Sequence, residues 1–158
     1  MRLVVFDVDG TLVDSQAQIL GAMAEAFAGL GLAVPGREAV LSIIGLSLPV
    51  ALARLAPGLD EADYGRLAEG YRSGWFRQTH EAAPPLYPGA RAVVEALAGR
   101  DDLLLGVATG KSRRGLDHVL AAYGLAGAFV TTQVADDHPS NPHPAMLLAA
   151  LARTEVDA

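Results

Sequence analysis

Two aspartates, Asp7 and Asp9, are the residues of this chain best placed to do chemistry. They follow a continuous apolar run, residues 3–6, whose β-branched side chains predict a strand buried on both faces. Their i, i+2 spacing puts both carboxylates on one side of the chain where it leaves the strand. Since ligands bind at the carboxyl ends of strands in open α/β sheets, we expect the pair to lie in a binding site.

The two carboxylates repel each other unless a cation or a shared proton offsets their charge. A magnesium ion would do so and would leave one aspartate free as a nucleophile and the other as an acid and base. The competing interpretation is that one aspartate caps the next helix and the other is a solvated loop residue. Because a glycine turn at Gly10 follows and a predicted buried strand precedes, we favour the catalytic interpretation.

The stretch from Asp7 to Ser15 resembles the first motif of the haloacid dehalogenase superfamily of phosphohydrolases. The resemblance implies that Asp7 attacks phosphorus and becomes an aspartyl phosphate. It implies that Asp9 protonates the leaving group and then activates water. It also implies a Mg²⁺ cofactor that takes a carboxylate oxygen of Asp7 and the backbone carbonyl of Asp9.

Composition limits the other classes of function. With 158 residues and 51% hydrophobic content, the chain can form one substantial core with a small insert. The absence of cysteine excludes disulfides and thiolate chemistry, and the net charge of −6 argues against a nucleic-acid partner. No apolar run is long enough for a membrane span, so we expect no membrane partner and a cytoplasmic location. The expected partner is a small phosphorylated metabolite.

Periodicity predicts a helical segment followed by an α/β segment. The first part is expected to form helices over residues 15–30, 38–44, 49–55 and 60–79. A non-helical return with three prolines follows at residues 82–89. The second part is expected to contain helices over 88–98, 112–123 and 144–153 and strands over 103–108 and 128–131.

The predicted fold class is therefore α/β, a partial doubly wound parallel sheet with an inserted α-helical cap. Residues 1–14 and 85–158 are expected to form the core, and residues 15–84 the cap. By the resemblance, the cap closes over the site and excludes water, with hinges at residues 14–15 and 83–86. A rigid structural subdomain is the alternative.

A second candidate anion site follows the strand predicted over residues 103–108. Thr109, Gly110 and Lys111 come next and open a helix, where a hydroxyl and free backbone N–H groups can hold an anion. Thr109 matches the family's second motif, whose hydroxyl and following amide hold the phosphoryl group. Ser112 capping its own helix would explain part of this pattern.

The family's third motif falls within residues 136–144, and Asn141 occupies the position of its usual lysine. Asparagine donates hydrogen bonds but carries no charge. Lys111, the only lysine of the chain, could supply the missing cation, although it could equally contact the substrate phosphate or solvent; Arg113 and Arg114 are the other candidates. The phosphate-binding candidates are Gly10, Thr109, Gly110, Lys111 and Asn141. We interpret His138 and His143 as polar loop residues.

The family's fourth motif, which would complete the magnesium site, would lie beyond Val156 and is absent from this sequence; Asp157 is not assigned to that role. The third metal ligand is therefore missing, and activity is expected to be impaired. In the family's usual strand order, the strand at residues 3–6 then becomes an exposed apolar edge. We expect a homodimer or aggregate through that edge, or a cap or helix folded over it.

The predicted function is Mg²⁺-dependent phosphomonoester hydrolysis through an aspartyl phosphate. Residues 45–48 and 110–113 and the cap position most resemble the phosphoglycolate phosphatase branch. One alternative is a non-catalytic binding or regulatory module or fragment, and another is transfer of the phosphosugar mutase type. A phospho-accepting receiver domain is disfavoured because no acidic residue ends the strand at 103–108.

Overall fold

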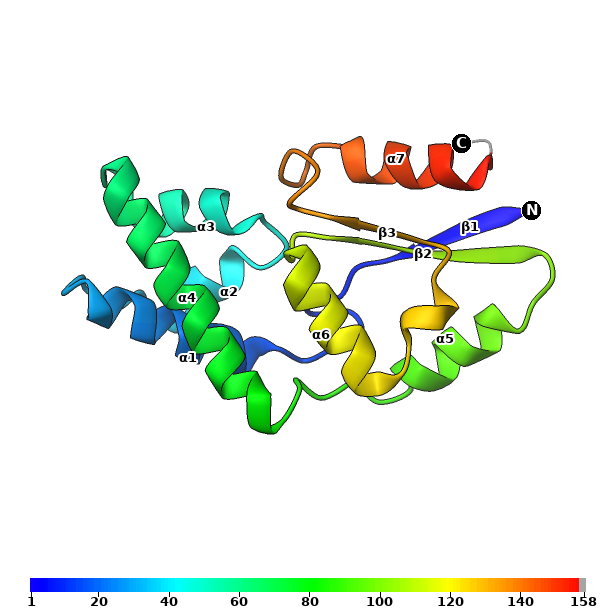
Figure 1. The fold of residues 1–158 in the computed structure, drawn as a ribbon, viewed down its shortest axis with the longest axis horizontal. Helices are drawn as coiled ribbons and strands as arrows, with labels where there is room; N and C mark the ends of the chain where they lie inside the picture. Colours follow the sequence, from blue (N-terminus) through cyan, green and yellow to red (C-terminus); the bar gives the residue numbers. More distant parts are fainter. Residues whose placement is uncertain (157–158) are drawn as a thin grey trace.

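The fold is built on a parallel sheet, seen in a computed structural model that describes residues 1–156 (Figure 1). Within that part of the chain the strands are β1 (Arg2–Phe6), β2 (Leu103–Thr109) and β3 (Thr131–Val134), in the order β1-β2-β3. All pairs are parallel. The predicted α/β class is confirmed. Asp157, which the sequence analysis leaves out of the metal site, lies outside the described residues.

Helices cover both faces of this sheet. Figure 1 shows α7 (Ala145–Thr154) on one side and α5 (Ala90–Ala98) and α6 (Arg113–Tyr123) on the other. Helices on both faces are the expected result of parallel strands joined by helical crossovers. The strands therefore all end at the same edge of the sheet, next to the start of α6.

The burial of the strands follows their position in the sheet. In the central strand β2, Leu105 and Val107 are buried, as predicted. The residues of β1 after Arg2 are only partly buried, whereas the sequence predicts burial on both faces. The reason is topological, because β1 pairs with β2 on one side and lies at the edge of the sheet formed by residues 1–156.

The predicted third strand is misplaced by three residues. Its expected start lies in a short 3-10 turn, Ala126–Ala128, and the strand itself begins at Thr131. The apolar residues before Thr131 suggested a strand, but the pairing uses the polar sequence Thr-Thr-Gln-Val instead. Gln133 and Thr131 are both buried and satisfy each other through a 2.8 Å side-chain hydrogen bond, which makes this polar strand compatible with burial.

Four helices form the insert that we call the helical insert, residues 15–84. They are α1 (Gln16–Gly29), α2 (Arg37–Ser42), α3 (Leu48–Leu55) and α4 (Glu61–Glu81). Small residues let α1 and α4 approach closely: a Cβ at Gly70 would lie 3.3 Å from Cα of Ala26. Each helix was expected, with ends shifted by one or two residues. The long α4 is capped by Asp60, whose carboxylate accepts the Asp63 amide at 2.8 Å.

The chain leaves and re-enters the core at one place. The Asp14 amide donates to the Pro85 carbonyl at 2.8 Å, and the Tyr87 amide donates to the Leu12 carbonyl at 3.0 Å. The two connecting segments therefore lie side by side, next to the end of β1. None of the helices in the described part of the chain combines the length and apolar character that a membrane crossing requires.

Candidate active site

Asp7 and Asp9 follow β1 directly, at the edge of the sheet where all strands end. The Val8 amide donates to Asp7 Oδ1 at 2.7 Å and fixes that carboxylate. The chain then turns at Gly10, whose φ of +82° is readily adopted only by glycine. The Gly10 amide donates to the Val13 carbonyl at 3.0 Å. Gly10 therefore shapes the turn, and its N–H is not free for a phosphate in this conformation.

Burial raises the pKa of Asp7 above its usual value. The nearby charge of Asp9 raises it further. The Val8 amide, the Thr109 hydroxyl and the charge of Lys111 lower it without cancelling the rise. The two carboxylates therefore repel each other, as the sequence predicts, and a bound cation would reduce this repulsion.

Asp9 is held by two side chains from different parts of the chain. Ser15 Oγ donates to Asp9 Oδ1 at 2.6 Å, and Lys111 Nζ donates to Oδ1 at 2.9 Å and to Oδ2 at 3.0 Å. The sequence suggests Ser15 only as a possible cap for α1. Its side chain makes no capping hydrogen bond and instead orients Asp9, a role that the sequence pattern did not reveal.

Lys111 lies where the sequence analysis allows a substitute cation. Its Nζ is 3.9 Å from the centre of the Trp75 ring, so a cation–π contact adds to the ion pair with Asp9. The other two candidates are engaged elsewhere. Arg113 donates to Thr132, and Arg114 lies over the ring of Phe76.

The Thr109–Gly110 turn lies against the helical insert. Thr109 is buried, and its Oγ1 accepts the Lys111 amide at 3.2 Å. A Cβ at Gly110 would lie 2.5 Å from the Gly45 carbonyl oxygen, so only glycine allows the two backbones to come this close. Ser112 caps α6 by accepting the Gly115 amide at 3.2 Å. The anion site predicted here has the hydroxyl and helix start that it requires.

Asn141 lies at the contact between the core and the insert. Its Nδ2 donates to the Gly45 carbonyl at 3.0 Å, and next to it Ser140 Oγ accepts the Ser47 amide at 2.9 Å. Asn141 is not among the residues that line the cavity described below. Its prediction as a phosphate-binding residue therefore stays a prediction, whereas its hydrogen bond to the insert is observed.

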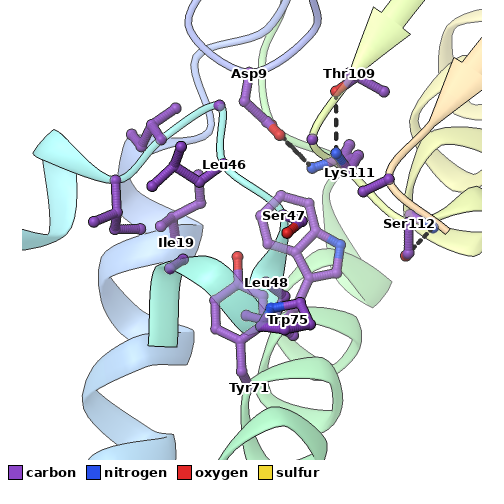
Figure 2. A pocket seen from close by; sticks show the side chains of 18 of the residues that line it. Asp9, Ile19, Leu46, Ser47, Leu48, Tyr71, Trp75, Thr109, Lys111 and Ser112 are labelled. Atoms are coloured by element: carbon purple, nitrogen blue, oxygen red, sulfur yellow. Dashed lines mark hydrogen bonds and ion pairs between the residues drawn. The ribbon is translucent and has the colours of Figure 1, made fainter. Parts of the chain in front are cut away.

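A cavity of about 430 Å³ lies between the core and the insert (Figure 2). Its core wall is polar and includes Asp7, Asp9, Thr109, Lys111, Asp136 and His138. Its insert wall is mostly apolar and includes Ile19, Met23, Ile43, Ile44, Leu46 and Leu48. An apolar pocket with a few convergent polar groups is the usual form of a small-molecule site.

Two aromatic residues of α4 also line the cavity. Burial raises the pKa of Tyr71, and the charge of Asp9 adds to the rise, so this side chain stays a neutral hydroxyl. Trp75 is buried, but its Nε1 has no hydrogen-bond partner among the described residues. The i, i+4 spacing of these two aromatic residues could have indicated a shared face, but not that this face meets the carboxylates.

The donor atoms at the carboxylate pair suit a hard divalent cation. Mg²⁺ prefers oxygen ligands and is often bound by one or two carboxylates, waters and a substrate phosphate. In the described part of the chain, no three His, Cys, Asp or Glu side chains converge as a ready-made cluster. His138 bonds to Gln133 at 2.7 Å and lines the cavity, whereas His143 accepts the Ala145 amide at 3.2 Å. The interpretation of both as polar loop residues stays an interpretation.

Comparison with known proteins identifies the family. The family model described as haloacid dehalogenase-like hydrolase matches residues 4–158. The chain therefore belongs to the haloacid dehalogenase-like hydrolases, as its motifs predict.

Individual relatives include named phosphatases. The chain is 34% identical over 160 residues to a protein named probable phosphatase IndB from Dickeya dadantii, covering 99% of this chain and 69% of that protein. It is 34% identical over 155 residues to a phosphoglycolate phosphatase of Cereibacter sphaeroides, covering 94% of this chain and 70% of the relative. The crystal structure of a hydrolase from Pseudomonas syringae superposes with a TM-score of 0.86 at 25% identity, covering 99% of this chain and 71% of the other.

Proposed function

We propose that this protein hydrolyses phosphomonoesters through an aspartyl phosphate on Asp7, with Mg²⁺ as cofactor. One observation carries the proposal: the two carboxylates after β1 share a cavity with the Thr109 turn and with Lys111. Membership of the hydrolase family and similarity to named phosphatases support it. The arrangement supplies a nucleophile, an acid and base, and a place for an anion.

In the first step, an Asp7 carboxylate oxygen forms a bond to phosphorus and the bond from phosphorus to the ester oxygen breaks. Asp9 gives its proton to the leaving oxygen, which departs as the alcohol. In the second step, water attacks the aspartyl phosphate while Asp9 takes a proton from it. Inorganic phosphate leaves, and Asp7 is restored as a carboxylate.

Side chains of this protein position the two aspartates for these steps. Ser15 and Lys111 hold Asp9, and the Val8 amide holds Asp7. We propose that Lys111 takes the part of the cation that Asn141 cannot supply. Mg²⁺, held by a carboxylate oxygen of Asp7 and the Asp9 carbonyl, would neutralise charge on the phosphoryl oxygens.

We propose that the helical insert acts as a cap over this cavity and that the substrate is a small phosphorylated metabolite. The insert supplies one whole wall of the cavity, which supports a role in excluding water. Phosphoglycolate appears in the names of several relatives and is the reference compound to test first.

The test is release of phosphate from p-nitrophenyl phosphate by the whole 158-residue chain, with Mg²⁺ and with EDTA, beside Asp7→Asn. We expect Mg²⁺-dependent release that falls by at least about 10³-fold in the variant, since the nucleophile is lost. Release that is equal in both proteins would contradict the proposal. Tight phosphate binding without turnover would instead favour a non-catalytic binding module.

We also propose that a second copy of the chain pairs along the edge of β1 that has no partner strand within residues 1–156. The apolar residues of this edge strand are only partly buried, and an unpaired strand edge is a template for another strand. Light scattering after size exclusion should give the molar mass of a dimer, and Val4→Lys should shift the monomer–dimer equilibrium toward the monomer. A parent protein that is monomeric at all concentrations would contradict this proposal.

A further inference from the structure

The insert wall of the cavity is well suited to contact an uncharged part of a bound substrate. Its aliphatic side chains come from α1, from the loop before α3 and from α3 itself; Ile19, Ile43 and Leu46 are examples. Figure 2 shows Ile19, Leu46 and Leu48 on the side of Trp75 away from Ser112. Placing a charged group against such a wall costs free energy unless a partner offsets it.

The cavity is also larger than a two-carbon substrate needs. Phosphoglycolate has nine non-hydrogen atoms and would occupy less than roughly 270 Å³ even if each atom took the ~30 Å³ of a water molecule. The cavity measures about 430 Å³. The proposed Mg²⁺ and its waters would take part of this space, and hydrocarbon placed against the apolar wall would gain from burial.

The insert offers few groups to receive a carboxylate. A helix start is a common place for an anion, and α3 begins in this wall. The Ser47 amide, however, already donates to Ser140, and Pro49 in the first turn has no N–H, which leaves the amides of Leu48 and Val50 at this helix start. Arg72 lines the cavity but is exposed, and exposed ion pairs contribute little. Lys111 is engaged by Asp9.

Two neutral polar groups of α4 lie at the cavity. Trp75 Nε1 is a buried donor without a partner among the described residues, and Figure 2 shows it on the Ser112 side of the ring, away from the aliphatic side chains. Tyr71 carries a neutral hydroxyl in the cavity. In Figure 2 the hydroxyl oxygen of Tyr71 points along the cavity toward the aliphatic side chains. The Tyr71 hydroxyl suits an uncharged molecule that has a hydrogen-bonding group.

Resting on the phosphatase function above, we propose that the substrate is the phosphate ester of an uncharged alcohol with a sizeable apolar body. The phosphoryl group would lie at the core wall, and the apolar body would lie against Ile19, Leu46 and Trp75. A substrate that carries a carboxylate close to its phosphate, such as phosphoglycolate, is disfavoured.

The experiment measures binding of phosphonates, whose C–P bond is not hydrolysed. Trp75 is the only tryptophan of the chain, so its fluorescence reports on this cavity alone. The compounds are methylphosphonate, phosphonoacetate and 2-phenylethylphosphonate, each titrated with Mg²⁺ present. We expect 2-phenylethylphosphonate to bind on the order of tenfold or more tighter than methylphosphonate, because its ring is buried on the apolar wall. Phosphonoacetate should bind no tighter than methylphosphonate.

Phosphonoacetate binding as tightly as 2-phenylethylphosphonate would overturn the inference, and so would the absence of any saturable change. These outcomes differ from failure of the proposed hydrolysis. If the expected order of binding is found but p-nitrophenyl phosphate is not cleaved, the assignment of the cavity stands and the catalytic proposal fails. If cleavage depends on Asp7 but the order is reversed, only the inference on substrate fails.

Three variants sharpen the result. Leu46→Lys places a cation in the apolar wall. It should lower the affinity for 2-phenylethylphosphonate and raise the affinity for phosphonoacetate. Val50→Lys adds the same charge on an exposed part of α3 outside the cavity and should leave the order of the three phosphonate affinities unchanged. Arg72→Gln should change neither affinity by more than about twofold, as expected for an exposed charge. A selective loss of phosphonoacetate binding in Arg72→Gln would show that Arg72 receives a carboxylate and would overturn the inference.

Discussion

The two walls of the cavity are built in different ways. In the core wall the side chains are tied to one another, because Asp9 accepts hydrogen bonds from Ser15 and Lys111, and Asp7 accepts one from the Val8 amide. In the insert wall most side chains touch the cavity only through packing, as Ile19 and Leu46 do. Hydrogen-bonded charges are fixed in geometry, whereas apolar side chains can be exchanged at modest cost. We therefore expect substitutions in the core wall to change the rate and substitutions in the insert wall to change which compound binds.

The largest effect after loss of the nucleophile should come from Lys111→Met. The variant keeps an unbranched side chain against Trp75 but removes the cation from Asp9. Removing one electrostatic group from such a site typically costs 10²–10³-fold in rate, and we expect a loss of about that size in kcat. Steady-state kinetics with p-nitrophenyl phosphate measures it. Arg114→Met is the matched control, because it removes a cation that lies over Phe76. Its kcat should fall far less than that of Lys111→Met.

Gly110→Ala tests whether the two walls must meet. Its Cβ would lie 2.5 Å from the Gly45 carbonyl oxygen and 2.7 Å from that of Leu46, so the loops must move apart. Misplacing a group by about 1 Å can cost on the order of 10²-fold, and we expect kcat/KM to fall by up to that factor. Gly65→Ala is the control, since a Cβ there meets no atom within 4 Å and sits within α4. Equal activity in both variants would mean that this close approach is not needed for catalysis.

Asn141 provides a smaller test of the same contact. Asn141→Ala removes one hydrogen bond to the Gly45 carbonyl, whose net contribution is about 1 kcal/mol, or roughly fivefold. We expect KM to rise by no more than that factor while kcat is kept. Asn141→Lys should not raise kcat, because Lys111 already supplies a positive charge beside Asp9. A large gain in kcat for Asn141→Lys would mean that a missing cation limits the rate.

The smallest effect concerns stability without metal. Because burial raises the pKa of Asp7 in the folded protein, the folded state binds more protons than the unfolded state between the ordinary and the raised pKa. Stability contributed by this group is therefore present at low pH and is lost as pH rises through that window. In EDTA, Asp7→Asn should have a higher Tm than the parent protein at pH 7, and the difference should vanish in acid. A lower Tm at pH 7 would contradict this sign.

The sequence predicts the core wall better than the insert wall, for a physical reason. Asp7, Asp9 and Thr109 follow predicted strands, and parallel strands bring their carboxyl ends to one edge of a sheet. The sequence alone therefore places these residues together. For Lys111 the sequence leaves several alternatives open; the structure shows Lys111 bonded to Asp9 and the two arginines in other contacts, and the role of Lys111 as the substitute cation stays a proposal.

The insert wall depends on tertiary packing that no local pattern specifies. Periodicity identifies the helices of the insert, but not that Trp75 contacts Lys111. Ser15 follows the rule for a helix cap, yet its hydroxyl bonds to Asp9 because that carboxylate is within reach. The three-residue error in β3 has a similar origin, since Thr131 and Gln133 become compatible with burial through the hydrogen bonds that Gln133 makes with Thr131 and with His138.

The contact between the insert and the loop around Asn141 affects how fast the cavity could open relative to enzyme turnover. The hydrogen bonds Ser47–Ser140 and Asn141–Gly45 each contribute about 1 kcal/mol net, so together they hold this contact closed by only a few kcal/mol. An equilibrium of that size leaves an open form populated at roughly 0.1–10%. Hinge motions between such states take microseconds to milliseconds, whereas a typical enzyme turns over about ten times per second. If the insert acts as the proposed cap, its opening on this timescale would be faster than such a turnover.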